Sequence, residues 1–143
     1  MIVVDASIFA KLILDEPDSG TAGKLIADAM DAGETLLAPT LLVQETLQIG
    51  LRWSIPAETT LDFIETLRTG GFQMREPARP EYELASKIAQ FGDPKSGYPQ
   101  LADSIYHAMA IICGGILITA DRRHAAKAAS FGAVKLLADW KPD

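Results

Sequence analysis

Two acidic residues follow short apolar runs that have the character of buried strands. Asp5 comes directly after residues 2–4 (IVV), and Asp121 comes two residues after the run ILIT at 116–119. The carboxyl ends of parallel strands meet at one edge of a sheet, where ligands bind in many α/β proteins. If these two strands are neighbours, we expect both carboxylates to face one cleft.

Two further acids lie on predicted helices. On a period of 3.6 residues, Glu45 shares a face with Leu41 and Ile49, so it interrupts an apolar stripe. A carboxylate in such a place is costly unless it is paired or bound to a metal. Asp103 begins a helix directly after the Gly- and Pro-rich loop at 92–100. Both acids are therefore candidates for the same chemistry as the strand-end pair.

Each acid also has a purely structural interpretation. Asp5 can hydrogen-bond the next backbone amides as a turn residue, and Asp121 can cap a helix at 122–131. Asp103, in the first turn of its helix, can complement the helix dipole. Glu45 is the hardest of the four to explain in this way.

Taken together, the four acids have the composition of a site for a hard cation. Two like charges about 4 Å apart repel by about 4 kcal/mol at an effective dielectric constant of about 20. That is a large part of a domain's stability, which is about 5–15 kcal/mol. Either some of the carboxyls are protonated or a divalent cation neutralises them. Oxygen ligands favour Mg²⁺ or Mn²⁺, which bind phosphate oxygens and activate water for phosphodiester hydrolysis.

The elements that must position these acids alternate along the chain. Strands are predicted at 1–4, 35–38, 72–75, 116–119 and 134–137, and helices at 7–14, 19–32, 40–51, 57–68, 80–90, 102–113 and 122–131. Thr40 is predicted to cap the third helix. The alternation is typical of an α/β fold with a parallel sheet. Because the 143 residues contain no repeat or linker, we expect one domain over 1–143.

Composition restricts the class of protein. Hydrophobic residues make up 48% and charged residues 22% of the chain, as in globular proteins. No apolar run reaches the roughly 18–20 residues of a membrane span, and the N-terminus lacks the features of a signal peptide. The single cysteine, Cys113, is interpreted as a core residue in a reducing compartment, so we expect a cytoplasmic protein. The net charge of −6 argues against general charge-driven binding of nucleic acid, but not against a nuclease with a local acidic site.

Four segments, in order, resemble the motifs of the PIN-domain nucleases, and among these the VapC-type toxins of toxin–antitoxin pairs. They are VVDASIFAK with Asp5, APTLLVQETLQIG with Glu45, YPQLADSIYHAMA with Asp103, and ILITADRRHA with Asp121. The resemblance implies a three-layer α/β/α fold around a short parallel sheet. It also implies an endoribonuclease dependent on Mg²⁺ or Mn²⁺, an RNA substrate, a homodimer and a cognate antitoxin. In that family the four acids would be the catalytic metal ligands, supported by Ser7 and Thr119.

Basic residues near these motifs are candidates for contacts with RNA phosphates. Arg122 and Arg123 directly follow Asp121, and Lys95 lies in the loop before Asp103. A solvated helix or loop surface is the alternative for each of them. For Tyr98, in the same loop, the sequence does not decide between packing and base stacking.

The two histidines have less specific surroundings. His107 lies four residues after Asp103 on the same helix face, and we predict that it packs against the fold. His124 lies in a basic run and is predicted to be exposed, with no role in the site.

Two other functions compete with the nuclease. In a non-catalytic PIN-like binding module, the acids would be structural. An aspartyl-phosphate phosphatase also has an aspartate at a strand end, but it needs a second aspartate two residues later, where this chain has Ser7.

Overall fold

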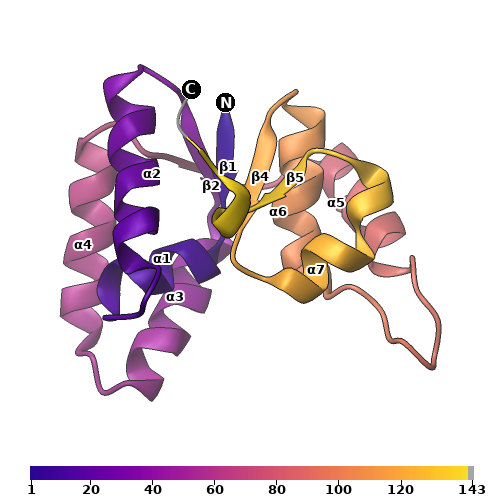
Figure 1. Cartoon of the computed structure of the whole chain (residues 1–143), viewed down its shortest axis with the longest axis horizontal. Coiled ribbons are helices and arrows are strands. Elements are labelled where there is room, and N and C mark those ends of the chain that lie inside the picture. The colour runs from indigo at the N-terminus through magenta and orange to yellow at the C-terminus, as the bar shows by residue number, and fades with distance from the viewer. Residues whose placement is uncertain (142–143) are drawn as a thin grey trace.

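Five short parallel strands form the central sheet of the computed structural model, which describes residues 1–141. The strands are β1 (Ile2–Val4), β2 (Leu36–Pro39), β3 (Gln73–Arg75), β4 (Ile116–Thr119) and β5 (Val134–Leu136). Their order in the sheet is β3-β2-β1-β4-β5. Figure 1 shows the sheet between two groups of helices. The predicted three-layer α/β/α fold is therefore confirmed.

Seven α-helices cover the sheet. They are α1 (Ala6–Ile13), α2 (Ser19–Asp31), α3 (Leu41–Arg52), α4 (Ala57–Thr69), α5 (Arg79–Ala89), α6 (Leu101–Ile112) and α7 (Arg122–Lys127). Helix α6 packs against β1, β2 and β4 and carries α5 on its outer side. Helices α1 to α4 lie together on the other side of the sheet, as Figure 1 shows. Within residues 1–141, none of the helices combines the length and the apolar character that crossing a membrane requires.

The central strands are buried on both faces, which explains their uninterrupted apolar sequences. Val3 and Val4 in β1 are fully buried, and Leu117 and Ile118 in β4 are at most 1% exposed. The two strands pair in register, with Val4 opposite Ile118. From β1 the chain builds outwards through β2 and β3, and it then returns to place β4 on the other side of β1. The crevice at this switch point, outside the carboxyl ends of β1 and β4, is where ligands bind in such sheets.

Three local predictions were wrong. The helix predicted at 122–131 ends at Lys127 and is followed by the 3₁₀ turn η1 (Ala129–Phe131). The last strand ends one residue early, where the 3₁₀ turn η2 (Leu137–Asp139) begins. Thr40 precedes α3, but its hydroxyl donates to Glu76 and does not cap the helix.

We predict opposite effects on stability for two glycine substitutions. A Cβ on Gly115, just before β4, would lie 2.6 Å from the carbonyl oxygen of Met1. Gly115→Ala should therefore lower the free energy of unfolding by about 1–3 kcal/mol, because backbone must move to make room. Gly23 lies inside α2 with open space around it, so Gly23→Ala should raise that free energy by about 0.5–1 kcal/mol. Urea unfolding of the two variants measures both effects, and equal stability of the two would contradict the packing described for β1 and β4.

Candidate active site

Asp5 connects the end of β1 to the start of α1. Its Oδ1 accepts hydrogen bonds from the backbone N–H groups of Ser7 (3.0 Å) and Ile8 (3.3 Å), and also from the Ser7 hydroxyl. The side chain is 5% exposed, and burial raises its pKa although these hydrogen bonds lower it. The predicted interaction with the following amides is thus present. It occupies Oδ1 and leaves Oδ2 for another partner.

Asp121 repeats this arrangement after β4. Its Oδ1 accepts from the backbone N–H groups of Arg123 (2.8 Å) and His124 (3.0 Å), so it caps α7. Both aspartates therefore make the hydrogen bonds to following backbone amides that their structural interpretation predicts. This interpretation does not compete with a functional one, because each cap uses a single carboxylate oxygen.

Ser7 and Thr119 connect the two strand ends. The Ser7 hydroxyl donates to Asp5 and accepts from the backbone N–H of Ala120 (2.9 Å). The Thr119 hydroxyl accepts from the backbone N–H of Asp121 (2.9 Å) and lies 3.5 Å from the Ser7 hydroxyl. The Ser7 side chain, after β1, thus holds the backbone of the turn after β4. The positions of Asp5 and Asp121 are therefore linked through Ser7 and Thr119.

Glu45 extends from α3 to the same region and meets a tyrosine of α6. The hydroxyl of Tyr106, which is fully buried, donates to Glu45 Oε1 at 2.7 Å. Burial and the charge of Asp5 raise the pKa of Glu45, against the lowering effect of this hydrogen bond. Tyr106 belongs to the third of the PIN-like motifs, and its position three residues after Asp103 places both on one helix face.

Asp103, in the first turn of α6, is affected by the charges of the other three candidate acids. Burial and the charges of Asp5, Asp121 and Glu45, in that order, raise its pKa to about 7. Within residues 1–141 its carboxylate accepts no hydrogen bond that would offset this effect. The charges of the other three predicted acids therefore act on Asp103, and Asp103 and Asp121 line one small cavity.

The donor set fits a divalent cation that keeps part of its water shell. All the donors are carboxylate oxygens, which Mg²⁺ and Mn²⁺ prefer. Within the described residues, no three His, Cys, Asp or Glu side chains form a ready-made metal-binding group. Mg²⁺ commonly binds through only one or two carboxylates and retains several waters, so an open arrangement is compatible with it. Asp5 and Asp103 are the residues that would hold the ion.

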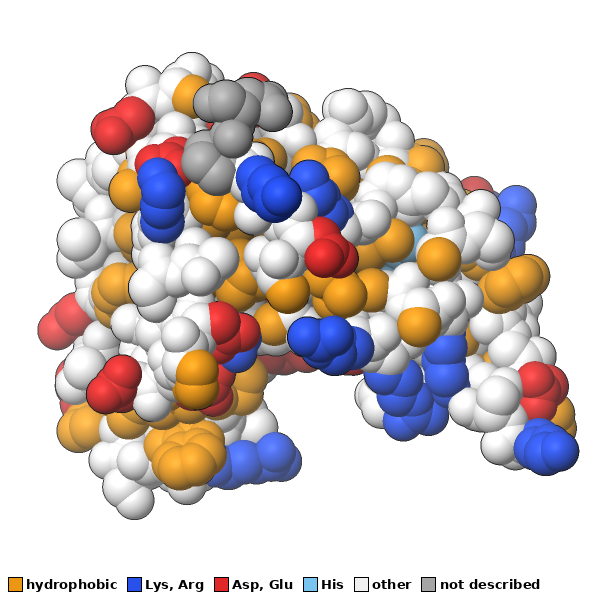
Figure 2. Space-filling view, in the orientation of Figure 1, with side chains coloured by type: hydrophobic (Ala, Val, Ile, Leu, Met, Phe, Trp, Pro, Cys, Tyr) orange, Lys and Arg blue, Asp and Glu red, His pale blue; other side chains and the backbone are white. Residues whose placement is uncertain are grey.

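The predicted basic residues lie at different distances from the acids. Arg123 lines a small cavity of about 20 Å³ together with Asp103 and Asp121. Lys127, which the sequence analysis did not single out, also lines it. Arg122 and Lys95 are exposed and are not among the residues around this cavity. Figure 2 shows the molecule hollowed below the strand ends, with basic side chains gathered below α7.

The prediction for His124 was wrong, because its side chain is buried against α6. Its Nε2 lies 3.2 Å from Nδ1 of His107, whose Nε2 lies 2.5 Å from the carbonyl oxygen of Gly132. A carbonyl only accepts, so His107 carries its hydrogen on Nε2 and accepts one from His124. Burial and His107 lower the pKa of His124 to about 4, so this pair is neutral at neutral pH. Both histidines pack α7 against α6, as predicted only for His107.

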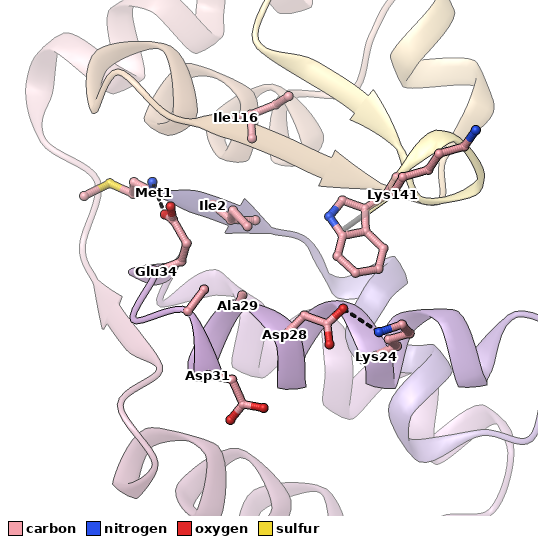
Figure 3. A pocket seen from close by; sticks show the side chains of 11 residues that line it. Met1, Ile2, Lys24, Asp28, Ala29, Asp31, Glu34, Ile116 and Lys141 are labelled. Atoms are coloured by element: carbon pink, nitrogen blue, oxygen red, sulfur yellow. Dashed lines mark hydrogen bonds and ion pairs between the residues drawn. The ribbon is translucent and has the colours of Figure 1, made fainter. Parts of the chain in front are cut away.

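A larger hollow, of about 680 Å³, opens at the opposite edge of the sheet. Figure 3 shows it between the starts of β1 and β4, at Ile2 and Ile116, and the side of α2. Its charged side chains have mixed signs, and Lys24 is paired with Asp28. None of the four acids lines it, so the size of this hollow does not identify the site.

Comparisons with known proteins agree with this architecture. The family model described as the PIN domain matches residues 2–130. The chain is similar to VapBC-1 from nontypeable Haemophilus influenzae, with 18% identity, a TM-score of 0.71, and coverage of 97% of this chain and 100% of that chain. For VapC20 of Mycobacterium tuberculosis, described as a sarcin-ricin loop cleaving toxin, identity is 17%, the TM-score 0.67, and coverage 88% and 95%. For VapBC2 from Rickettsia felis, solved with a DNA fragment from its promoter, the values are 15%, 0.69, 95% and 97%. No curated protein sequence matches the chain.

We predict that Asp103→Asn stabilises the protein when no metal ion is present. In the folded state the pKa of Asp103 is raised from 3.8 to about 7, so its ionised form disfavours folding at pH 8. The substitution should raise the free energy of unfolding at pH 8 by about 1–3 kcal/mol. The gain should shrink as the pH falls from about 7 towards 4, because Asp103 then becomes protonated in the native wild-type protein.

Urea unfolding in EDTA at several pH values measures this difference. Asp62→Asn, which removes an exposed carboxylate on α4, is the matched control and should change stability little. A destabilising effect of Asp103→Asn at pH 8 would contradict the convergence of charge on this residue.

Proposed function

The chain belongs to the PIN domain family, and from that premise we propose that it is a metal-dependent endoribonuclease of the VapC type, the toxin of a type II toxin–antitoxin pair. One observation carries the proposal: Asp103 lines a cavity with Asp121, and burial and the charges of Asp5, Asp121 and Glu45 raise its pKa. Helix capping explains the positions of Asp5 and Asp121, but it does not explain why Glu45 and Asp103 lie near them. An acidic cleft of this kind suits a divalent cation and the phosphodiester that such a cation binds.

We assign the four acids different tasks within the site. Asp5 and Asp103 would hold a Mg²⁺ or Mn²⁺ ion, and Glu45 and Asp121 would complete its surroundings or hold a second ion. When bound, the ion would neutralise the acids, polarise the scissile phosphate and make the attacking water more acidic. No histidine or serine nucleophile is required, in keeping with the burial of His107 and His124.

The remaining residues of the site act by holding these carboxylates in place. Ser7 and the caps of α1 and α7 leave one oxygen of Asp5 and one of Asp121 directed away from the backbone. Tyr106, whose side chain is fully buried, holds Glu45 by a hydrogen bond. Preorganisation of this kind reduces the rearrangement needed when the substrate binds.

The proposal extends to substrate and partners. VapC20 is described as cleaving the sarcin-ricin loop, and VapBC-1 and VapBC2 carry the names of toxin–antitoxin pairs. By analogy we propose an RNA substrate, a cognate antitoxin and a homodimer for this chain. We further propose that residues 1–143 form one nuclease domain that acts in the cytoplasm, with Arg122, Arg123 and Lys95 near the RNA.

We predict that Asp5→Asn and Asp103→Asn each reduce Mg²⁺-dependent RNA cleavage at least about 100-fold, since each removes a charge that the ion requires. The measurement is the rate of cleavage of total RNA, followed by sequencing of the cut ends. Asp62→Asn is the control and should keep the wild-type rate. Wild-type activity in a folded Asp5→Asn or Asp103→Asn variant would show that the site is misassigned.

We also predict that Mg²⁺ raises the melting temperature of the wild-type protein. Binding to the native state alone contributes about 2.7 kcal/mol when the free ion is at 100 times its Kd. The double variant Asp5→Asn, Asp103→Asn should be more stable than the wild type in EDTA and should not respond to the ion. Equal responses of the two proteins to Mg²⁺ would favour the non-catalytic binding module, in which the acids are structural.

A further inference from the structure

Positive charge is concentrated in the segment that contains α7 and the loop before α6. Residues 86–135 hold six basic and three acidic residues, a net charge of +3 in a chain of net −6. Two of those three acids are Asp103 and Asp121 of the candidate site. The rest of the chain is therefore strongly negative and repels a polyanion. RNA should be attracted to the basic residues of this segment.

The cations nearest to the site have no acidic partner. Within residues 1–141, neither Arg123 nor Lys127 takes part in an ion pair. Four other basic residues are paired: Lys11 with Glu16 and Asp18, Lys24 with Asp28, Arg75 with Glu81, and Arg79 with Glu83. Hydrogen bonds from Ser96 and Lys95 and, last, the charge of Lys127 lower the pKa of the exposed Asp93, and Lys127 forms no ion pair with it. In a chain with 19 acidic residues, two unpaired cations beside an acidic cleft are available to an external anion.

The loop at 92–100 is fastened to α7 in a way that holds these two cations in position. Lys127 Nζ donates to the carbonyl oxygen of Ser96, and this leaves further donors of the ammonium group free. A Cβ on Gly97 would lie 2.8 Å from the guanidinium of Arg123 and 2.9 Å from Lys127 Nζ. Both side chains therefore lie across the backbone of this glycine. Asp93 closes the loop by accepting from the backbone N–H groups at 95 and 96.

An exposed aromatic ring lies beside the same cations and the same acids. Tyr98 is 46% exposed and lines the small cavity with Arg123, Lys127, Asp103 and Asp121. The cavity, of about 20 Å³, holds roughly one water and is far too small for a nucleobase. A base at this place must therefore lie on the open face of the ring, outside the cavity.

We infer that Arg123, Lys127 and Tyr98 form a subsite for the nucleotide next to the scissile phosphate. The two cations bind the phosphate of that nucleotide, and the ring of Tyr98 stacks on its base. The inference rests on the proposed function, because the acids define where the scissile phosphate lies. Stacking on Tyr98 requires that the base of this nucleotide be unpaired, since a base within a duplex does not offer its face to a side chain.

The test measures binding of a fluorescent oligouridylate of about ten nucleotides in EDTA and low salt, where no cleavage occurs. Arg123→Ala and Lys127→Ala should each weaken binding about 3- to 10-fold. Each should also reduce the slope of log K against log salt by about 0.7, the value for one phosphate contact to a single strand. Arg68→Ala, which removes an exposed and unpaired cation from α4, is the matched control and should bind like the wild type.

Tyr98 is tested separately from charge. Tyr98→Leu should weaken binding about 5- to 100-fold, whereas Tyr98→Phe, which keeps the ring, should stay near the wild-type value. On an oligonucleotide without bases, the wild type and Tyr98→Leu should bind equally. With Mg²⁺ present, all the weakened variants should raise KM for RNA cleavage more than they lower kcat.

The outcomes separate this inference from the proposed function. If wild-type protein cleaves RNA and the three positions behave like Arg68→Ala, the subsite is wrong and the nuclease stands. If binding depends on these positions but the wild type cleaves no RNA, an RNA-binding site at these residues is supported, while the proposed nuclease and the place of this site next to a scissile phosphate are contradicted. Absence of any binding of the oligonucleotide by wild-type protein at low salt would also overturn the subsite.

Discussion

Repulsion between carboxylates at one edge of the sheet is the constraint around which this structure is organised. Asp5, Glu45, Asp103 and Asp121 come from four separate segments, and burial together with the charges of the other three raises the pKa of Asp103. The parallel topology makes such a meeting unavoidable once acids follow β1 and β4, because their carboxyl ends lie side by side. This repulsion destabilises the protein when no metal ion is bound. A bound cation would convert the same repulsion into affinity.

The surrounding fold limits this cost without removing it. The caps of α1 and α7 supply hydrogen bonds to one oxygen of Asp5 and one of Asp121, and Tyr106 supplies one to Glu45. Asp103 receives none within the described residues, so no hydrogen bond offsets its raised pKa. The positive charges of Arg123 and Lys127 lie beside Asp103 and Asp121, around the same small cavity.

Sequence reasoning located the acids because their environments are local. An apolar run that ends in aspartate, or a glutamate within an apolar stripe, is visible without knowledge of the fold. It failed where a long-range contact decides the outcome. His124 appears exposed in a basic run, yet His107 from α6 buries it. Thr40 is a residue type that often caps helices, but its hydroxyl donates to Glu76, which is distant in the sequence. The importance of Lys127 depends on a loop that approaches α7 only in three dimensions.

The most direct test of this account is a crystal of the wild-type protein soaked in Mn²⁺, with data collected to reveal the anomalous signal of the ion. The account predicts a strong peak in the cleft, in contact with the carboxylates of Asp5 and Asp103 and with Glu45 and Asp121 close by. An ion that binds elsewhere while this cleft stays empty at saturating Mn²⁺ would contradict it. Four carboxylates found on separate faces of the molecule would contradict it as well.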